Sequence, residues 1–204
     1  MVQRIWVAHQ YNLIRMKELI KVIQERLIAA STPGARAATR KFVPGSARVY
    51  GVRMPFLNQL AREYKGGGFV LVKELWRSGT YEERVLAAKM LGKVCKQNPV
   101  LALTLAAQFS KDISDWAVCD AMGMQALKPV AGSMREEIFQ LAEKLVSAEN
   151  PWQRRYALVL VEVFSKDPAA HKRIKQLIKQ LQDEEEYYVL KAVAWLKRNL
   201  SKGK

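Results

Sequence analysis

The sequence predicts an all-α protein, an α-solenoid of stacked antiparallel HEAT-like helix pairs. Apolar residues recur with the 3.6-residue period of amphipathic helices through most of the 204 residues, and alternating strand-like runs are nearly absent. A pattern also repeats at intervals of 34, 36 and 35 residues, and each copy has an alanine five residues after its start. Paired helices with this period stack into solenoids, because each pair buries its apolar faces against its neighbours. The four copies start at Glu82, Trp116, Trp152 and Tyr187.

The N-terminal third is less regular. Residues 3–30 show one helical pattern that has room for a single break. Residues 31–50 contain two Pro-Gly pairs and four basic side chains, so we expect a long loop there, either mobile or functional. A helix should follow over 54–64, with Pro55 in its first turn, where the missing N–H is harmless. The three glycines at 66–68 should end it.

The remaining residues predict about four helix pairs. We expect 69–77 to pair with 80–97, 99–110 with 113–126, 133–148 with 151–164, and 168–182 with 184–201. Three of these helices should start where a capping side chain, Asn98, Asn150 or Asp167, precedes a proline. The chain is thus expected to form one HEAT-like repeat domain, with N-terminal helices and a basic loop over 1–65 and the helix pairs over 66–204.

The charge balance favours a polyanionic partner. Lys and Arg number 34 against 19 Asp and Glu, which gives a formal charge of +15. The excess is +9 over 1–65, +1 over 66–165 and +5 over 166–204, so both ends are basic. Nucleic acid is the first partner to consider, although charged helix faces that only keep the protein soluble fit the same numbers. No signal peptide or 20-residue apolar run is evident, so we expect a cytoplasmic protein without membrane spans.

Polar and aromatic residues interrupt the repeats where alanine and leucine would suffice. Trp116 and Asp120 are four residues apart, as are Lys191 and Trp195, so each pair shares a helix face. Equivalent positions of successive second helices line one surface of a solenoid, and Arg155 lies in the same register. Each member also has a structural explanation: the tryptophans as packing residues, and Asp120 as the ion-pair partner of Arg155.

Other enzymatic signals are weak. His9 and His171 lie near opposite ends without a nucleophile motif, and the glycines at 66–68 lack the lysine of a phosphate-binding loop. Cys95 and Cys119 have no metal-ligand spacing and should be small core residues. We therefore expect neither a metal nor another cofactor.

With these residues assembled, the chain resembles the AlkD-type DNA alkylation repair glycosylases, which are built from HEAT-like repeats. The resemblance rests on YGVRMP at 50–55, ELW at 74–76, DWAVCD at 115–120, NPWQRR at 150–155 and KAVAWLKR at 191–198. It implies Asp120 as the catalytic anion, Arg155 as the active-site arginine, and Trp116 and Trp195 as aromatic walls for the sugar. It also implies removal of positively charged N3- or N7-alkylated purines from double-stranded DNA, without flipping the base from the stack.

Basic side chains at both ends are candidates to hold the duplex backbone of alkylated DNA. They are Arg36, Arg40, Lys41, Arg48, Arg154, Lys172, Arg173, Lys191 and Arg198. We expect the protein to act as a monomer. Two alternatives stay open from the sequence: a non-catalytic binder of branched or distorted DNA on the same scaffold, and a HEAT-type adaptor between proteins.

Overall fold

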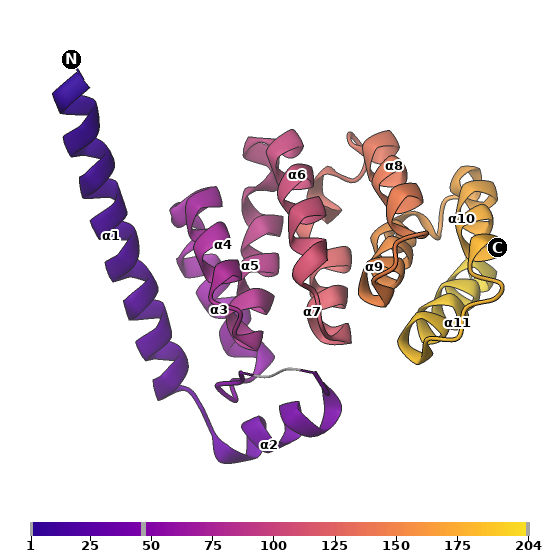
Figure 1. Ribbon diagram of the computed structural model, residues 1–204, viewed down its shortest axis with the longest axis horizontal. Helices are drawn as coiled ribbons and strands as arrows, with labels where there is room; N and C mark the ends of the chain where they lie inside the picture. Colours follow the sequence, from indigo (N-terminus) through magenta and orange to yellow (C-terminus); the bar gives the residue numbers. More distant parts are fainter. Residues whose placement is uncertain (1, 46–47, 203–204) are drawn as a thin grey trace. The chain divides into compact units, whose positions relative to one another are not determined.

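The computed structural model describes residues 2–45 and 48–202, with side chains from Arg15 onward, and these residues are almost entirely helical (Figure 1). They form eleven α-helices, and no strand occurs among them, which confirms the predicted all-α class. The chain divides into two compact units, Met1–Met90 and Leu91–Lys204, and the division falls inside α5. A continuous solenoid and a single repeat domain both stay predictions.

The first unit contains α1 (Val2–Ala29), α2 (Pro33–Phe42), α3 (Met54–Glu63), α4 (Gly68–Arg77) and most of α5 (Tyr81–Val94). The first helix runs without the break for which the sequence left room. It packs against α4, and Ile23 and Leu27 on its inner face are fully buried. As predicted, α3 ends before the glycines: Lys65–Gly67 forms a short 3-10 turn, and Gly68 begins α4. Apolar periodicity thus located α1, α3 and α4 correctly.

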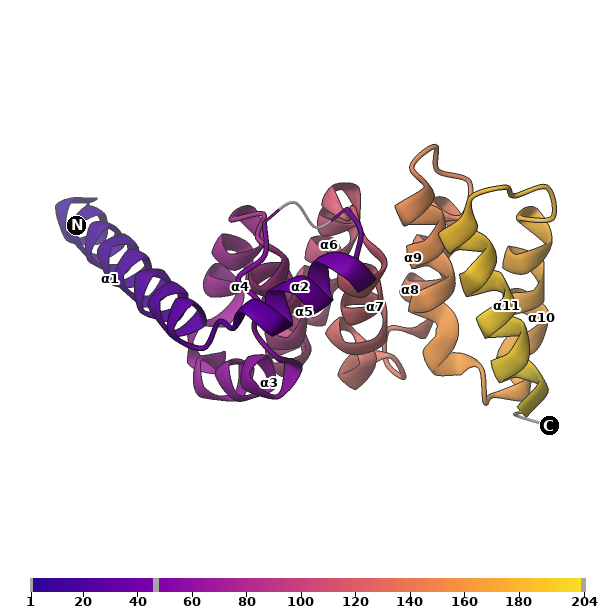
Figure 2. The same cartoon turned by 90° about the horizontal axis from the view of Figure 1, so that it is seen from below.

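The long loop predicted over 31–50 is wrong in its first half, because Pro33–Phe42 forms the short helix α2 (Figure 2). Thr32 caps this helix, and its hydroxyl accepts a hydrogen bond from the Ala35 N–H at 3.1 Å. Pro33 occupies the first turn, where proline is compatible with a helix. The threonine–proline pair is therefore a start signal that outweighs the following Gly34. Residues 46 and 47 of the predicted loop lie outside the described residues.

A buried carboxylate anchors the segment that follows. Glu82, fully buried at the start of α5, accepts N–H hydrogen bonds from Tyr50, Gly51 and Val52 at 2.9, 2.7 and 3.1 Å respectively. Gly51 has a φ of +90°, and a Cβ there would lie 2.6 Å from the Cβ of Arg36. Both the backbone conformation and the space therefore require glycine. This anchor ties residues 50–52, and through them α2, to α5.

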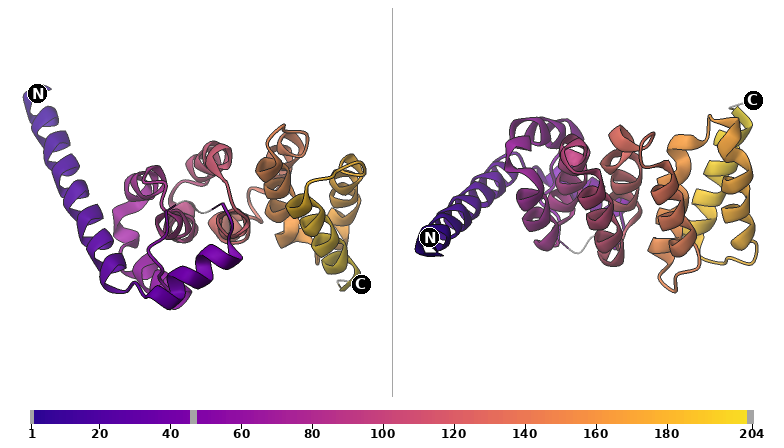
Figure 3. Two further views of the ribbon diagram at one scale, coloured as in Figure 1. Left: turned by 60° about the horizontal axis from the view of Figure 1, so that its bottom comes forward. Right: turned by 90° about the horizontal axis from the view of Figure 1, so that it is seen from above.

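The second unit contains the helices that hold the candidate site. Its helices are α6 (Pro99–Phe109), α7 (Trp116–Ala121), α8 (Arg135–Leu145), α9 (Pro151–Val161), α10 (Pro168–Gln180) and α11 (Tyr187–Lys202). α9 contacts α7, α8, α10 and α11, and every residue from 155 to 161 is buried. Figure 3 shows the orange and yellow helices α8 to α11 from two sides. α9 is therefore the central helix of this unit.

Local residue signals mark where three helices of this unit begin and where α7 changes its helix type. Asn98, Asn150 and Asp167 each accept a backbone N–H hydrogen bond at 2.9–3.0 Å, which confirms the three predicted caps. The helix predicted over 113–126 instead begins at Trp116, where Asp115 caps it, and changes to a π-helical turn over Met122–Ala126. Gly123 in this turn lies against Val159, because a Cβ added there would be 2.5 Å from the Val159 Cγ1. Close packing on α9 accompanies the change of helix type.

Candidate active site

A bidentate ion pair joins α7 to α9 at the predicted site. The Arg155 Nη2 donates to Asp120 Oδ1 at 2.8 Å and to Oδ2 at 3.0 Å, and Nε donates to Oδ1 at 3.2 Å. The side chain of Asp120 keeps 27% of its surface exposed, whereas that of Arg155 keeps 9%. The ion pair expected from the sequence is confirmed. Its carboxylate stays accessible while its guanidinium lies inside the protein.

The guanidinium of Arg155 has a second acceptor on α11. Its Nη1 donates to the backbone carbonyl of Tyr188 at 2.6 Å. The ring of Tyr188 packs against that of Trp152, with centroids 5.2 Å apart. Arg155 therefore orients the carboxylate from within, with most of its donors engaged. Sequence reasoning missed Tyr188, because a carbonyl contact leaves no side-chain signature.

The electrostatics of the site centre on one carboxylate. Burial raises the pKa of Asp120 above the ordinary value, and the neighbouring Arg155 opposes that rise. Burial also raises the pKa of the Cys119 thiol, which is wholly inside the protein and contacts the Trp152 carbonyl at 3.9 Å. The thiol is therefore neutral, as expected for a small core residue. Asp120 accepts three hydrogen bonds from Arg155, and a carboxylate has about four lone-pair positions, so capacity for a water molecule or substrate remains.

The two tryptophans flank this pair in sequence register. Trp116 is the first residue of α7, one turn before Asp120, and is half-buried. Trp195 lies on α11 and is also half-buried. The structure brings Asp120 and Arg155 into direct contact. The common wall of both indoles with Asp120 stays a prediction from helix register.

An exposed strip of α11 continues from Trp195. Residues at positions 187, 191, 195 and 198 share one helix face by their spacing. Tyr187 is 58% exposed, and the Lys191 ammonium lies 4.6 Å from the centroid of its ring. Tyr187 also meets Tyr188 edge-on, at 5.0 Å between centroids. The sequence pointed to Lys191 and Arg198 on this strip, whereas Tyr187 served there only as the start of a repeat.

Two of the predicted DNA contacts have protein carboxylates as partners. Arg154 bonds Glu184 through two nitrogens, and its side chain is only 18% exposed. Arg173 bonds Glu136 and Glu143, with its guanidinium over the ring of Phe139. Both arginines direct donors at protein carboxylates, so a phosphate would have to compete with these partners, and their DNA contacts stay predictions. Sequence position alone does not separate such arginines from exposed ones.

The other predicted DNA contacts stay predictions. Five of them are exposed, namely Arg40, Lys41, Lys172, Lys191 and Arg198. Arg36 and Arg48 are exposed as well, but both also bond the backbone: Arg36 donates to the Tyr50 carbonyl at 3.0 Å, and Arg48 donates to the Ser78 carbonyl. Within the described part of the chain, no cluster of three metal-ligating side chains occurs, and no helix is long and apolar enough to span a membrane.

The candidate site lies within a stretch of the chain that matches a known protein family. Residues 23–204 match the family model described as DNA alkylation repair enzyme, and this stretch contains both α7 and α11 with the residues between them. No curated protein matches the chain. The family match agrees with the resemblance to the AlkD-type proteins that the sequence motifs indicate. Because the match covers nearly the whole chain, this protein belongs to the DNA alkylation repair enzyme family.

Proposed function

We propose that the protein is a DNA glycosylase that hydrolyses the N-glycosidic bond of positively charged N3- or N7-alkylated purines in duplex DNA. The observation that supports this most is the Asp120–Arg155 pair, a partly exposed carboxylate that a buried guanidinium holds in one orientation. The family match makes alkylated DNA the substrate to consider first. The reaction requires no cofactor.

The chemistry fits a fixed anion. Alkylation at N3 or N7 gives the purine a positive charge, so the base can leave with the bonding electron pair as a neutral molecule. The sugar then becomes oxocarbenium-like, and a carboxylate nearby stabilises this cation electrostatically. Asp120 supplies that charge, and its remaining lone pair both orients the water that adds to the sugar carbon and accepts the proton that this water loses. No protonation of the leaving base is needed.

The aromatic and basic residues serve binding in this proposal. Trp116 and Trp195 would contact the cationic sugar through their ring faces, each contributing about 0.5–2 kcal/mol. Exposed cations, among them Lys191 and Arg198 on the α11 strip, would bind the phosphates on either side. The base stays in the stack, as the resemblance to the AlkD-type glycosylases implies, so the reaction would tolerate bulky adducts.

Base release from a defined lesion tests the proposal. A duplex with one 7-methylguanine is incubated with excess protein, and free base is measured by chromatography against the spontaneous rate. We expect release well above that rate. Strong, salt-dependent DNA binding without release would instead identify a non-catalytic binder. Weak binding to every DNA tested would favour an adaptor between proteins.

A further inference from the structure

The consecutive arginines of α9 hold the start of α11 at two places. Arg155 donates to the Tyr188 carbonyl at 2.6 Å, and Arg154 bonds the carboxylate of Glu184, four residues earlier in the chain. Only Arg155 touches Asp120. Arg154 is thus one residue from the site, and its side chain has a separate task.

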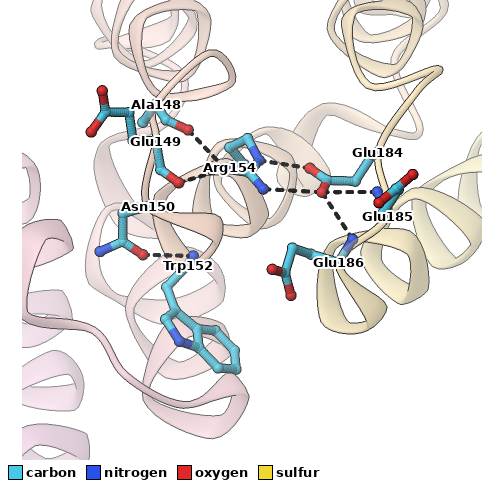
Figure 4. A network of polar contacts seen from close by, with 8 residues as sticks. All are labelled: Ala148, Glu149, Asn150, Trp152, Arg154, Glu184, Glu185 and Glu186. Carbon is cyan, nitrogen blue, oxygen red and sulfur yellow. Dashed lines mark hydrogen bonds and ion pairs between the residues drawn. The ribbon is translucent and has the colours of Figure 1, made fainter.

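Arg154 donates several hydrogen bonds, all of them to acceptors of the protein itself. Its Nε lies 2.6 Å from Glu184 Oε2, and its Nη2 lies 3.0 Å from Oε1 (Figure 4). The Nη1 donates to the carbonyls of Ala148 and Glu149 at 2.9 and 2.7 Å. Arg154 therefore joins the turn before α9 to the segment before α11. This arrangement leaves the guanidinium little freedom to move.

Glu184 organises the other side of the pair. Its side chain is only 5% exposed, and Oε1 also accepts the backbone N–H groups of Glu185 and Glu186 at 3.2 and 3.0 Å. The hydrogen bonds from Arg154 lower the pKa of Glu184, so the pair stays charged at neutral pH. The carboxylate thus fixes the two residues that lead directly into α11. That helix carries the Tyr188 carbonyl and Trp195.

Stability alone does not account for such a pair. Removing two charges from water costs free energy that their attraction often fails to recover, and apolar residues frequently replace buried ion pairs without loss of stability. A bidentate pair with four further backbone partners instead specifies one geometry. Here that geometry fixes residues 184–186, which directly precede the helix that carries the Tyr188 carbonyl, the second acceptor of Arg155.

We propose that Arg154 and Glu184 are positioning residues of the active site, which hold the start of α11 so that Tyr188 orients Arg155 and, through it, Asp120. The proposal rests on the glycosylase function proposed above. Loss of the pair loosens α11, leaves Arg155 with one firm partner, and misplaces the carboxylate and Trp195. A misplacement well below 1 Å is enough to slow a reaction about tenfold.

The test compares Glu184→Gln, which keeps the shape but removes the charge, with Asp167→Asn. Asp167 makes an ion pair with Arg135 in the same unit, at the start of α10 rather than of α11, and asparagine can still cap α10. We expect Glu184→Gln to slow single-turnover base release about tenfold while affinity for undamaged duplex changes less than twofold. Asp167→Asn should match the parent in both. Arg154→Lys, which keeps the charge but loses the bidentate geometry, should also slow release and serves if Glu184→Gln does not fold.

A second readout does not depend on enzymatic activity. The pKa of the Asp120 carboxyl can be followed by carbon NMR, with Asp120→Asn to assign its signal. A less firmly held Arg155 opposes the rise in that pKa less, so we expect a higher pKa in Glu184→Gln than in the parent or in Asp167→Asn. If Glu184→Gln only lowers the unfolding temperature, with parental release rate and Asp120 pKa, the pair is structural and the proposal is wrong. A parent that releases no base would refute the glycosylase function instead, and the NMR titration would still decide whether the pair orients Asp120.

Discussion

Replacing Asp120 with asparagine removes the negative charge of the site while keeping its shape and two hydrogen-bonding positions. The folded protein should persist, because the asparagine carbonyl can still accept from Arg155. Duplex binding should also change little, since a carboxylate does not attract phosphates. The loss should therefore appear in the rate of base release rather than in affinity.

The geometry of the ion pair sets the size of this loss. At an effective dielectric of about 20, a carboxylate about 4 Å from the cationic sugar attracts it by about 4 kcal/mol. The Arg155 Nη2 is 2.8–3.0 Å from the Asp120 oxygens and lies on their buried side. Its charge is then roughly 7 Å from the sugar, where it repels by about 2 kcal/mol. Asp120→Asn removes the attraction and leaves the repulsion, so release should be about 1,000-fold slower.

A double variant tests whether the net charge of the ion pair determines the rate of base release. Asp120→Asn combined with Arg155→Gln removes both charges, hence only the net attraction of about 2 kcal/mol, and should be about 30-fold slower than the parent. The double variant should therefore release base about 30 times faster than the single one, by the same Coulomb arithmetic. Single-turnover release of 7-methylguanine, with spontaneous loss subtracted and folding checked by thermal unfolding, measures all three rates. Asp120→Asn within tenfold of the parent, or a double variant slower than the single one, would refute the electrostatic role.

Three further outcomes follow from other parts of the structure. Burial raises the pKa of Asp120 above the value of about 3.9 that an ordinary aspartate has. In a pH–rate profile, base release should therefore decline at a higher pH than it would with an ordinary aspartate. Asp120→Asn should lack that decline. The same raised pKa favours the folded state at low pH, and this contribution is lost as pH rises through the folded-state pKa. Glu82→Gln, which places an amide among three backbone donors, should lower the free energy of unfolding by about 2–3 kcal/mol in a denaturant titration, whereas exposed Glu25→Gln should not. Arg198→Gln should weaken duplex binding and reduce the slope of log affinity against log salt by about 1, and an unchanged slope would remove Arg198 from the interface.

The sequence predicted the helices and the ion pair through local and periodic signals. Asn98, Asn150 and Asp167 precede prolines, and each does cap a helix. Asp120 and Arg155 are 35 residues apart, the length of one repeat, so the register brought them to neighbouring helices before any contact was known. In a repeat protein, residues one repeat length apart in the sequence lie on neighbouring helices, whereas an irregular fold gives no such relation.

The features that sequence reasoning missed depend on the backbone. Helix α2 was not predicted, because two Pro-Gly pairs indicate turns. Thr32 and Pro33 together nevertheless favour a helix start. The three N–H groups that Glu82 accepts, and the Tyr188 carbonyl that orients Arg155, are main-chain partners. Because nearly all residues have the same main-chain groups, no residue type in the sequence indicates such a contact.

Arg154 and Arg155 show why residue type and charge do not suffice to assign a role. Successive side chains of an α-helix point about 100° apart, so two adjacent arginines have different surroundings. On α9 this rotation directs Arg155 toward α7 and Asp120, and Arg154 toward Glu184 before α11. Counted as cations, both contribute equally to the formal charge of +15. Placed in the fold, both direct their donors at acceptors of the protein itself, so exposed side chains elsewhere are the stronger candidates for phosphate contacts. In the proposed function, binding and chemistry therefore use different charges: exposed cations would attract the duplex, while a nearly neutral ion pair would act on the sugar.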